Sequence, residues 1–269
     1  MLKLEKFTTL VEVVPPANGD PQPILDQLQD ISHLAIHGFN IATNPVGKPR
    51  MSALALSSLI QQKTSKPAVL HCTVRDHNKI SLQSELWGAK ALGIQTAIIT
   101  TGDHLPPEQK QEVKFVGDLD VLDLIGMAQE TGLQTGVVFS PSSSENFSLE
   151  KNRLTKKIRK GAEFVVTQPV FDANQAHQLQ QFLSDLEIPL LMGVLPLWSS
   201  KHARFMDQQV SGIDIPGEIL QEMEDNAQPQ KTGLKLAQDM IQLSRDLFQG
   251  VCIMPPFQKY SLVEKMLES

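Results

Sequence analysis

Two carboxylic acids stand at the ends of apolar segments, where acid–base chemistry is possible. Glu12 lies within residues 11–16 (VEVVPP), and Asp103 closes residues 100–103 (TTGD). A carboxyl group inside an apolar strand faces either the interior or a covering helix, and burial raises its pKa toward the value that a general acid needs near neutral pH. The alternative for Glu12 is an acid at the strand edge that pairs with a nearby lysine. The glycine before Asp103 lets the backbone approach a ligand, although an ordinary Gly-Asp turn has the same sequence.

Polar side chains at two further segment ends could bind a ligand. His71 and Arg75 belong to residues 71–76 (HCTVRD), and Gln168 directly precedes a proline. A histidine within a strand is either a core residue or a ligand contact, and Arg75 could instead form a salt bridge with Asp76 that shapes the loop. The amide of Gln168 both donates and accepts hydrogen bonds, which suits an amide-bearing heterocycle. It could equally cap its own loop.

Several catalytic classes are excluded because their motifs are missing. The seven histidines form no H-E-x-x-H motif, and His71 beside Cys72 lacks the further ligands of a metal site, so we expect no bound metal. Cys72 and Cys252 are too far apart for a zinc motif, and two cysteines make no disulfide framework. The chain has neither a G-x-S-x-G elbow nor a P-loop. Two acids and a glutamine without a metal suit proton transfer beside an organic cofactor.

The elements that must position these residues alternate between strands and helices. Eight short runs are almost continuously apolar, which is typical of parallel strands covered on both faces; they are residues 9–14, 34–39, 68–73, 96–100, 135–139, 164–167, 190–195 and 251–254. Helical periodicity fills the gaps between them. This alternation predicts an α/β fold, a (β/α)8 TIM-type barrel, with an additional helix or two before the last strand. An open doubly wound sheet is the second choice, weakened by the missing G-x-G-x-x-G motif.

Length and composition agree with one such domain. The 269 residues are 41% hydrophobic and 20% charged, so we expect a single globular domain over residues 1–269. The net charge of −6 argues against nucleic-acid binding, which favours a basic face. No apolar stretch is long enough for membrane insertion, and charges interrupt residues 1–20 where a signal peptide would be apolar. We therefore expect a cytoplasmic protein.

Seven segments together resemble a known family. In chain order they are residues 11–16, 71–78, 88–94, 101–103, 160–172, 193–196 and 254–257. Through these segments, and almost end to end, the sequence resembles the methylenetetrahydrofolate reductase family. The resemblance implies a TIM-type barrel that carries FAD and acts in one-carbon metabolism. It implies that reduced flavin passes a hydride to the methylene carbon of 5,10-methylenetetrahydrofolate, giving 5-methyltetrahydrofolate, or that the reaction runs in reverse. NAD(P)H is the implied co-substrate that reduces the flavin.

The resemblance also implies roles for individual residues. Glu12 falls on the general acid that assists opening of the folate's five-membered ring, and Asp103 on the acid between flavin and pterin. Gln168 matches a glutamine that contacts the pterin. Met223 stands where some relatives have a phenylalanine that stacks on substrate or nicotinamide, and a thioether can also pack on a flat ring. The cofactor contacts are assigned to His71, Arg75, Thr100, Thr101, Gly102, Asp103 and Phe139, and its phosphates to Lys156 and Lys157.

Departures from the family pattern leave other functions open. Thr101 stands where some members have an arginine, and residues 139–144 (FSPSSS) lack a Tyr-Pro-Glu-x-His pattern found in others. One alternative is a folate-binding methyltransferase-type barrel without redox chemistry. Another is a subunit that receives electrons from a partner protein instead of NAD(P)H. The expected partners are therefore a folate substrate and either further copies of the chain or an electron-transfer subunit.

Overall fold

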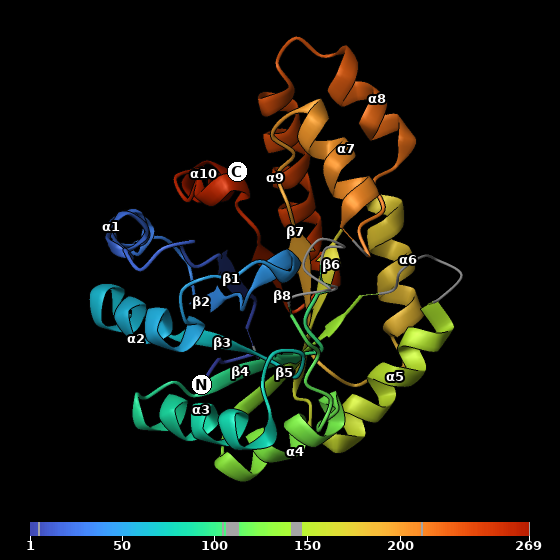
Figure 1. Ribbon diagram of the computed structural model, residues 1–269. Coiled ribbons are helices and arrows are strands. Elements are labelled where there is room, and N and C mark those ends of the chain that lie inside the picture. The colour runs from blue at the N-terminus through green and yellow to red at the C-terminus, as the bar shows by residue number, and fades with distance from the viewer. Residues whose placement is uncertain (5, 104, 106–112, 141–146, 211, 269) are drawn as a thin grey trace.

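Eight parallel strands close into a barrel in the computed structural model, which describes residues 1–4, 6–103, 105, 113–140, 147–210 and 212–268. Each strand pairs with its neighbours in chain order, and the last pairs with the first (Figure 1). The barrel predicted from the sequence is confirmed. The strands are β1 Thr8–Val13, β2 Gly38–Ile41, β3 Ala68–Thr73, β4 Thr96–Thr100, β5 Gln134–Phe139, β6 Phe164–Pro169, β7 Leu190–Val194 and β8 Gly250–Ile253.

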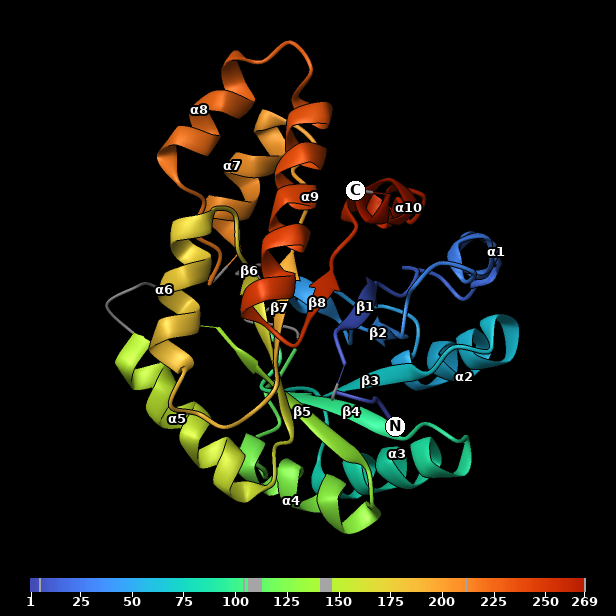
Figure 2. The same cartoon turned by 180° about the vertical axis from the view of Figure 1, so that it is seen from behind.

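Helices alternate with the strands and surround them. Each of the first six strands is followed by the helix of the same number: α1 Gln22–Ile31, α2 Ala53–Thr64, α3 Lys79–Ala91, α4 Val121–Thr131, α5 Phe147–Lys160 and α6 Ala173–Leu183. Between β7 and β8 come α7 Ser200–Gln209, α8 Gly217–Asp225 and α9 Pro229–Leu247, and α10 Leu262–Leu267 ends the described chain. Because α9 packs against β7 and β8, the paired α7 and α8 are the predicted additional helices, and they rise above the ring (Figure 2).

One strand begins later than its apolar run predicts. The run covers residues 34–39, whereas β2 is Gly38–Ile41. The backbone first turns tightly, since the Ile36 N–H donates to the carbonyl oxygen of Leu34 at 2.7 Å. Both side chains still contribute to the apolar layer outside the barrel. Hydropathy therefore finds the buried segment and misses where its backbone becomes extended.

The boundaries and faces of α3 follow from its local sequence. The Asn78 side chain accepts a hydrogen bond from the Ser81 N–H at 2.9 Å and caps the first turn. Beyond the last turn, Gly93 adopts φ 75°, as a residue that ends a helix often does. The inward face is fully buried at the three positions whose spacing predicts it, Leu82, Leu86 and Ala89.

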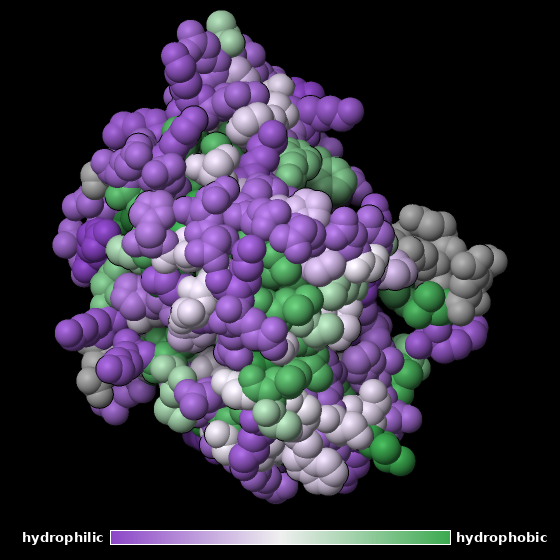
Figure 3. Space-filling view, turned by 90° about the vertical axis from the view of Figure 1, so that its left-hand side faces the viewer, coloured by the Kyte–Doolittle hydropathy of each residue, from purple (hydrophilic) through white to green (hydrophobic). Residues whose placement is uncertain are grey.

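The outer face of the helical layer is mixed in character. Figure 3 shows hydrophilic residues over much of the side that carries α1 to α3, with hydrophobic residues in its lower half. Ile80 and Trp87 share one face of α3 by their i, i+7 spacing, and they are 78% and 61% exposed. Within the described ranges, the helices lack the combination of length and apolar character that crossing a membrane requires.

Alternate strand residues fill the lumen and contact the helices. Phe164 fills the amino-terminal half of the lumen, where Gly136 leaves room for it: a Cβ at position 136 would overlap the phenyl ring. The residues between the lumen positions, such as Val11 and Leu70, pack against the helices. Apolar side chains fill the lumen below the carboxyl ends of the strands. The lumen cluster comprises Leu2, Leu10, Val69, Ile98, Phe164, Val166, Leu191 and Cys252.

Close backbone contact joins α9 to the segment after β7. A Cβ at Gly233 would overlap the carbonyl oxygen of Leu197, so only glycine fits this contact. The contact holds α9 beside a separate apolar cluster beneath α7 and α8. Its members are Phe171, Leu195, Leu197, Ala203, Ile213, Ile215, Ile219 and Met223.

Substituting Gly233 tests this packing. We expect Gly233→Ala to lower the free energy of unfolding by about 2 kcal/mol, because displaced backbone outweighs the better helix propensity of alanine. Gly217→Ala is the control: position 217 begins α8, and a Cβ there meets no atom within 4 Å. Urea denaturation of both variants is the measurement. Equal midpoints for the two variants would rule out the close contact.

Candidate active site

The carboxyl ends of the strands bring two acids together. Glu12 continues the lumen-facing series of β1 beyond Leu10 and pairs in register with Asn40 of β2. Asp103 lies just beyond β4. Its negative charge is near enough to raise the pKa of Glu12, so the two carboxyl groups share one mouth of the barrel.

Burial gives Glu12 the pKa of a neutral-pH acid. The side chain is half-buried, and its surroundings raise the pKa from 4.5 to about 7, first by burial and then by the charge of Asp103. Burial raises the pKa of Cys252 in the lumen and of Tyr260 beyond β8, and the nearby charge of Glu12 raises both further. Glu12 therefore carries a proton in a large fraction of molecules near pH 7 and can deliver it to a bound substrate.

Two neighbouring loops fix the position of Asp103. The Val46 N–H donates to its Oδ2 at 2.5 Å, and Nη1 of Arg75 donates to its carbonyl oxygen at 2.5 Å. The residue is otherwise exposed. Its carboxylate is thus held in place without being removed from the space above the barrel mouth.

Arg75 links these loops. Its guanidinium makes a two-point ion pair with Asp76, Nε to Oδ1 at 2.5 Å and Nη2 to Oδ2 at 2.6 Å. Burial alone would raise the pKa of Asp76, but hydrogen bonds from Arg75 and Asn44 outweigh it and the pKa is lowered. Arg75 is only 4% exposed. The structure therefore shows Arg75 bracing the loop of Asp103, and its contact with a cofactor stays a prediction.

The start of the β4 loop depends on a glycine. Gly102 has φ 90°, and a Cβ there would lie 3.0 Å from the Cβ of Arg75. Before it, the carbonyl oxygen of Thr101 accepts the Arg75 N–H at 3.1 Å. Thr100 pairs in register with Thr73 of β3 and is half-buried. All three expected contact residues of this segment therefore lie at the mouth.

Three buried polar atoms near the mouth find no hydrogen-bond partner among the described residues. They are Oδ1 of Asn40, Nε2 of His71 and Oγ1 of Thr73. Burial lowers the pKa of His71 to about 4, so its ring is neutral at physiological pH. A buried polar atom without a partner costs about 1–3 kcal/mol, and such atoms are uncommon in folded proteins. Together they offer one wall of the mouth to the polar edge of a ligand.

Two of these residues are missed by sequence reasoning. Asn40 follows the apolar run of residues 34–39. Thr73 is the last residue of the run 68–73 and lies two positions after His71, on the same face of β3. Because every second strand residue faces the same side, the candidate residue His71 is a signal that could have identified Thr73. Asn40 becomes apparent only through its register with Glu12.

Gln168 also reaches this mouth. It is the second-to-last residue of β6, where the pairing with β7 is irregular between Val166 and Pro169. Its side chain is half-buried, and Nε2 donates to the Ser140 hydroxyl at 2.9 Å. That bond joins the ends of β5 and β6, so the loop-capping alternative is realised, while the amide still lies at the carboxyl ends of the strands.

Two expected ring contacts lie elsewhere. Phe139 is 1% exposed and packs edge-on against Phe147 of α5, with ring centroids 5.8 Å apart, because its side chain faces the helical layer. Met223 is 1% exposed within the apolar cluster beneath α7 and α8. The structure does not bring either side chain together with Glu12, and their ligand contacts stay predictions.

The two lysines of α5 also lie outside the polar wall. Lys157 is half-buried, with Nζ 3.3 Å from Oε1 of Glu150 and donating to the carbonyl oxygen of Val138 at 3.2 Å. Lys156 is exposed on the same helix. Lys156 is therefore the more available of the two for a phosphate, and both assignments stay predictions. In the part of the chain that the structure describes, no group of three or more His, Cys, Asp or Glu residues could hold a metal ion.

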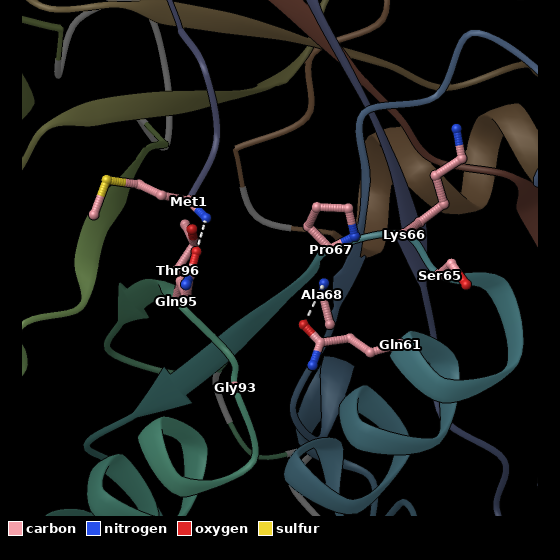
Figure 4. Close-up of a pocket in the computed structure, with 9 residues that line it drawn as sticks. All are labelled: Met1, Gln61, Ser65, Lys66, Pro67, Ala68, Gly93, Gln95 and Thr96. Carbon is pink, nitrogen blue, oxygen red and sulfur yellow. Dashed lines mark hydrogen bonds between the residues drawn. The ribbon is translucent and has the colours of Figure 1, made fainter.

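A cavity lies at the opposite end of the barrel. It has a volume of about 270 Å³ and is surrounded by the amino-terminal ends of β3 and β4 (Figure 4). Two hydrogen bonds join groups of its lining: Oε1 of Gln61 accepts the Ala68 N–H at 3.2 Å, and the Met1 ammonium group donates to Gln95. Functional groups of TIM-type barrels lie at the carboxyl ends instead, where Glu12 and Asp103 are found.

Sequence comparison decides the family. The profile of the family described as methylenetetrahydrofolate reductase matches residues 1–254. The chain belongs to the methylenetetrahydrofolate reductase family.

Curated relatives in this family are distant and longer. A probable methylenetetrahydrofolate reductase (NADPH) of Caenorhabditis elegans is 24% identical over 161 residues, which cover 58% of this chain and 24% of that protein. Methylenetetrahydrofolate reductase 2 of Schizosaccharomyces pombe is 22% identical over 233 residues, which cover 78% of this chain and 36% of that protein. The chain thus spans well under half the length of these relatives.

Solved structures agree on the fold. An uncharacterized protein from Clostridium thermocellum that binds two copies of 5-methyl-5,6,7,8-tetrahydrofolic acid matches with a TM-score of 0.73 and 16% identity, covering 97% of this chain and 93% of that one. The 7,8-dihydropteroate synthase of Vibrio fischeri matches with a TM-score of 0.56 and 10% identity, covering 98% and 91%. At these identities the likeness shows the barrel fold alone.

In this member of the methylenetetrahydrofolate reductase family, Glu12→Gln should change how stability depends on pH. The folded protein binds the Glu12 proton more tightly than the unfolded chain, because the pKa rises from 4.5 to about 7. The stability from this proton is present at low pH and is lost as the pH rises through about 7. Relative to wild type, the variant should gain on the order of 2 kcal/mol in free energy of unfolding between about pH 5 and about pH 8.

Urea denaturation at several pH values measures this difference. Glu264→Gln, at an exposed position on α10, is the matched control and should show no such trend. A constant difference between Glu12→Gln and wild type across the range would mean that Glu12 titrates like an exposed glutamate.

Proposed function

We propose that this protein is an FAD-dependent reductase that interconverts 5,10-methylenetetrahydrofolate and 5-methyltetrahydrofolate. The observation that carries the proposal is the pair of carboxyl groups at the barrel mouth, one with its pKa raised to about 7 and the other exposed and fixed by hydrogen bonds. Family membership supports the folate substrate. A neighbouring fold that binds 5-methyl-5,6,7,8-tetrahydrofolic acid adds support.

The wall formed by β2, β3 and the β4 loop suits the polar edge of a flavin. Asn40, His71 and Thr73 supply buried polar atoms that have no partner among the described residues, and a flavin ring edge carries both donors and acceptors that could pair with them. Gly102 lets the backbone approach the ring closely. Lys156 would contact the cofactor's phosphates. When bound, FAD supplies hydride transfer.

Glu12 would supply the proton for the folate. Opening of the folate's five-membered ring requires a proton on a weakly basic nitrogen, and a carboxyl group with a pKa of about 7 holds one near neutral pH. The opened ring is a cationic iminium, which the carboxylate of Asp103 would stabilise. Because Val46 and Arg75 already fix Asp103, little reorganisation is needed. The amide of Gln168 would contact the pterin, and the apolar lumen below would exclude water.

We assign NAD(P)H as the electron donor, with a protein donor as the second candidate. The second candidate is favoured by one observation: Met223, expected to pack on the nicotinamide or substrate ring, is 1% exposed. Anaerobic mixing of the purified protein with NADH, NADPH and 5-methyltetrahydrofolate in turn distinguishes the cases through flavin absorbance. Bleaching by a nicotinamide supports the first donor, and bleaching by 5-methyltetrahydrofolate alone supports the second. Protein that binds folate and no flavin would be a folate-binding barrel without redox chemistry, which overturns the proposal.

Glu12→Gln separates the two half-reactions. We expect the variant to reduce 5,10-methylenetetrahydrofolate at least about 100-fold more slowly, because glutamine cannot donate the proton. Reduction of its flavin by the electron donor should stay close to wild type, since no folate proton is involved. Single-turnover absorbance measurements follow both steps. Folate turnover at the wild-type rate would remove Glu12 from the mechanism.

A further inference from the structure

Two loops beside β1 repeat the same unusual turn. One-turn 3-10 helices follow β2 at Pro45–Gly47 and β8 at Pro256–Gln258. Each begins with proline, and its second residue is bulky and apolar with left-handed backbone angles. Val46 has φ 50° and ψ 29°, and Phe257 has φ 55° and ψ 32°. Large and β-branched residues rarely adopt this conformation, which glycine and asparagine tolerate far better.

Core packing does not account for these two residues. Val46 is 37% exposed and Phe257 is 64% exposed, and neither belongs to an apolar core cluster of the described residues. Phe257 does contact His202, with ring centroids 5.0 Å apart, but most of its surface stays open. Strained backbone with an exposed apolar side chain is typical of positions kept for binding rather than for stability.

Both turns are attached to the mouth that holds the acids. On the β2 side, the Val46 N–H donates to Oδ2 of Asp103 at 2.5 Å. On the β8 side, Nε2 of Gln258 donates to the carbonyl oxygen of Val14 at 3.0 Å, just beyond β1. Because β2 and β8 are the two pairing partners of β1, the turns flank the strand that carries Glu12.

The two strands that lead into these turns end far enough apart to admit one flat ring between their loops. Adjacent strands lie about 4.8 Å apart, so loops that leave β2 and β8 start about 10 Å apart. A planar ring in van der Waals contact on both faces needs about 7–8 Å. An aromatic side chain also gains specific stacking energy from such a ring.

We propose that Val46 and Phe257 form an apolar clamp on a flat heteroaromatic ring held above Glu12. The clamp rests on the proposed function, which supplies two such rings, the pterin of the folate and the isoalloxazine of the flavin. Phe257 thereby takes the ring contact expected of Met223, which is buried elsewhere. The strained backbone is retained because it projects both side chains at the mouth.

Phe257→Gly and Val46→Gly test the clamp in the full-length purified protein. Glycine relieves the left-handed strain and removes the side chain, so the thermal midpoint should stay equal or rise by a few degrees. The affinity for the clamped ring should fall about tenfold in Phe257→Gly and less in Val46→Gly. Phe257→Tyr keeps an aromatic ring and should bind with the wild-type affinity. Titration calorimetry with 5-methyltetrahydrofolate and with FAD, each added alone, measures the two rings separately.

Ser65→Gly is the matched control. Ser65 has φ 57° and ψ 15° at the end of α2, and it lines the cavity at the opposite end of the barrel (Figure 4). Its replacement should also leave the midpoint equal or higher, and it should leave both affinities unchanged. Relief of strain alone is thereby separated from loss of the clamp.

Each outcome decides the proposal. Weaker folate binding with unchanged FAD binding assigns the clamp to the pterin, and the reverse assigns it to the flavin; either supports it. Unchanged affinity for both rings in Phe257→Gly overturns the clamp while the proposed function stands. A lower midpoint in Phe257→Gly also overturns it, because the ring would then serve packing. Wild-type protein that binds neither ring overturns the proposed function, and the clamp with it.

Discussion

Burial of one carboxyl group at the mouth of a closed apolar barrel is the constraint on which the rest of the site depends. Glu12 has a pKa of about 7 because barrel closure surrounds it with protein and because Asp103 adds a second negative charge. Closure requires β8 to pair with β1, and this pairing also brings Cys252 of β8 near Glu12. An open sheet would leave β1 at an edge, where water would return the carboxyl group to its ordinary acidity.

The second acid is positioned by a different principle. Asp103 stays exposed and relies on hydrogen bonds from Val46 and Arg75, and Arg75 is itself held by Asp76. Three successive loops therefore act as one unit around the mouth. The two acids end in contrasting environments, one half-buried and protonated in part, the other exposed and fixed. Such contrast lets one carboxyl group donate a proton while its neighbour stabilises positive charge.

The sequence predicts those parts of this arrangement that depend on local patterns. Alternating apolar runs and helical periods specify the barrel and the extra helices, and an acid inside an apolar run identifies Glu12. Which face a strand residue presents is set by register around the closed barrel, so Phe139 falls on the helical side. Burial of Met223 follows from the packing of α7 on α8, which hydropathy does not reveal.

Tertiary features without a sequence signal account for the remainder. Asn40 gains its importance from register with Glu12, and its Oδ1 has no partner among the described residues. The left-handed angles of Val46 and Phe257 contradict the preferences of both residue types, so no propensity argument finds them. Such departures from local preference are concentrated around the mouth, as is common where function opposes stability.

Direct titration of Glu12 tests this view of the site most closely. Carbon-13 NMR of protein labelled at the glutamate carboxyl carbons follows the Glu12 signal, which is assigned by its absence in Glu12→Gln. The expected midpoint is about pH 7, moving down when Asp103 becomes asparagine. A midpoint near the ordinary value of 4.5, unaffected by Asp103, would show that neither burial in the barrel nor Asp103 raises the pKa of Glu12.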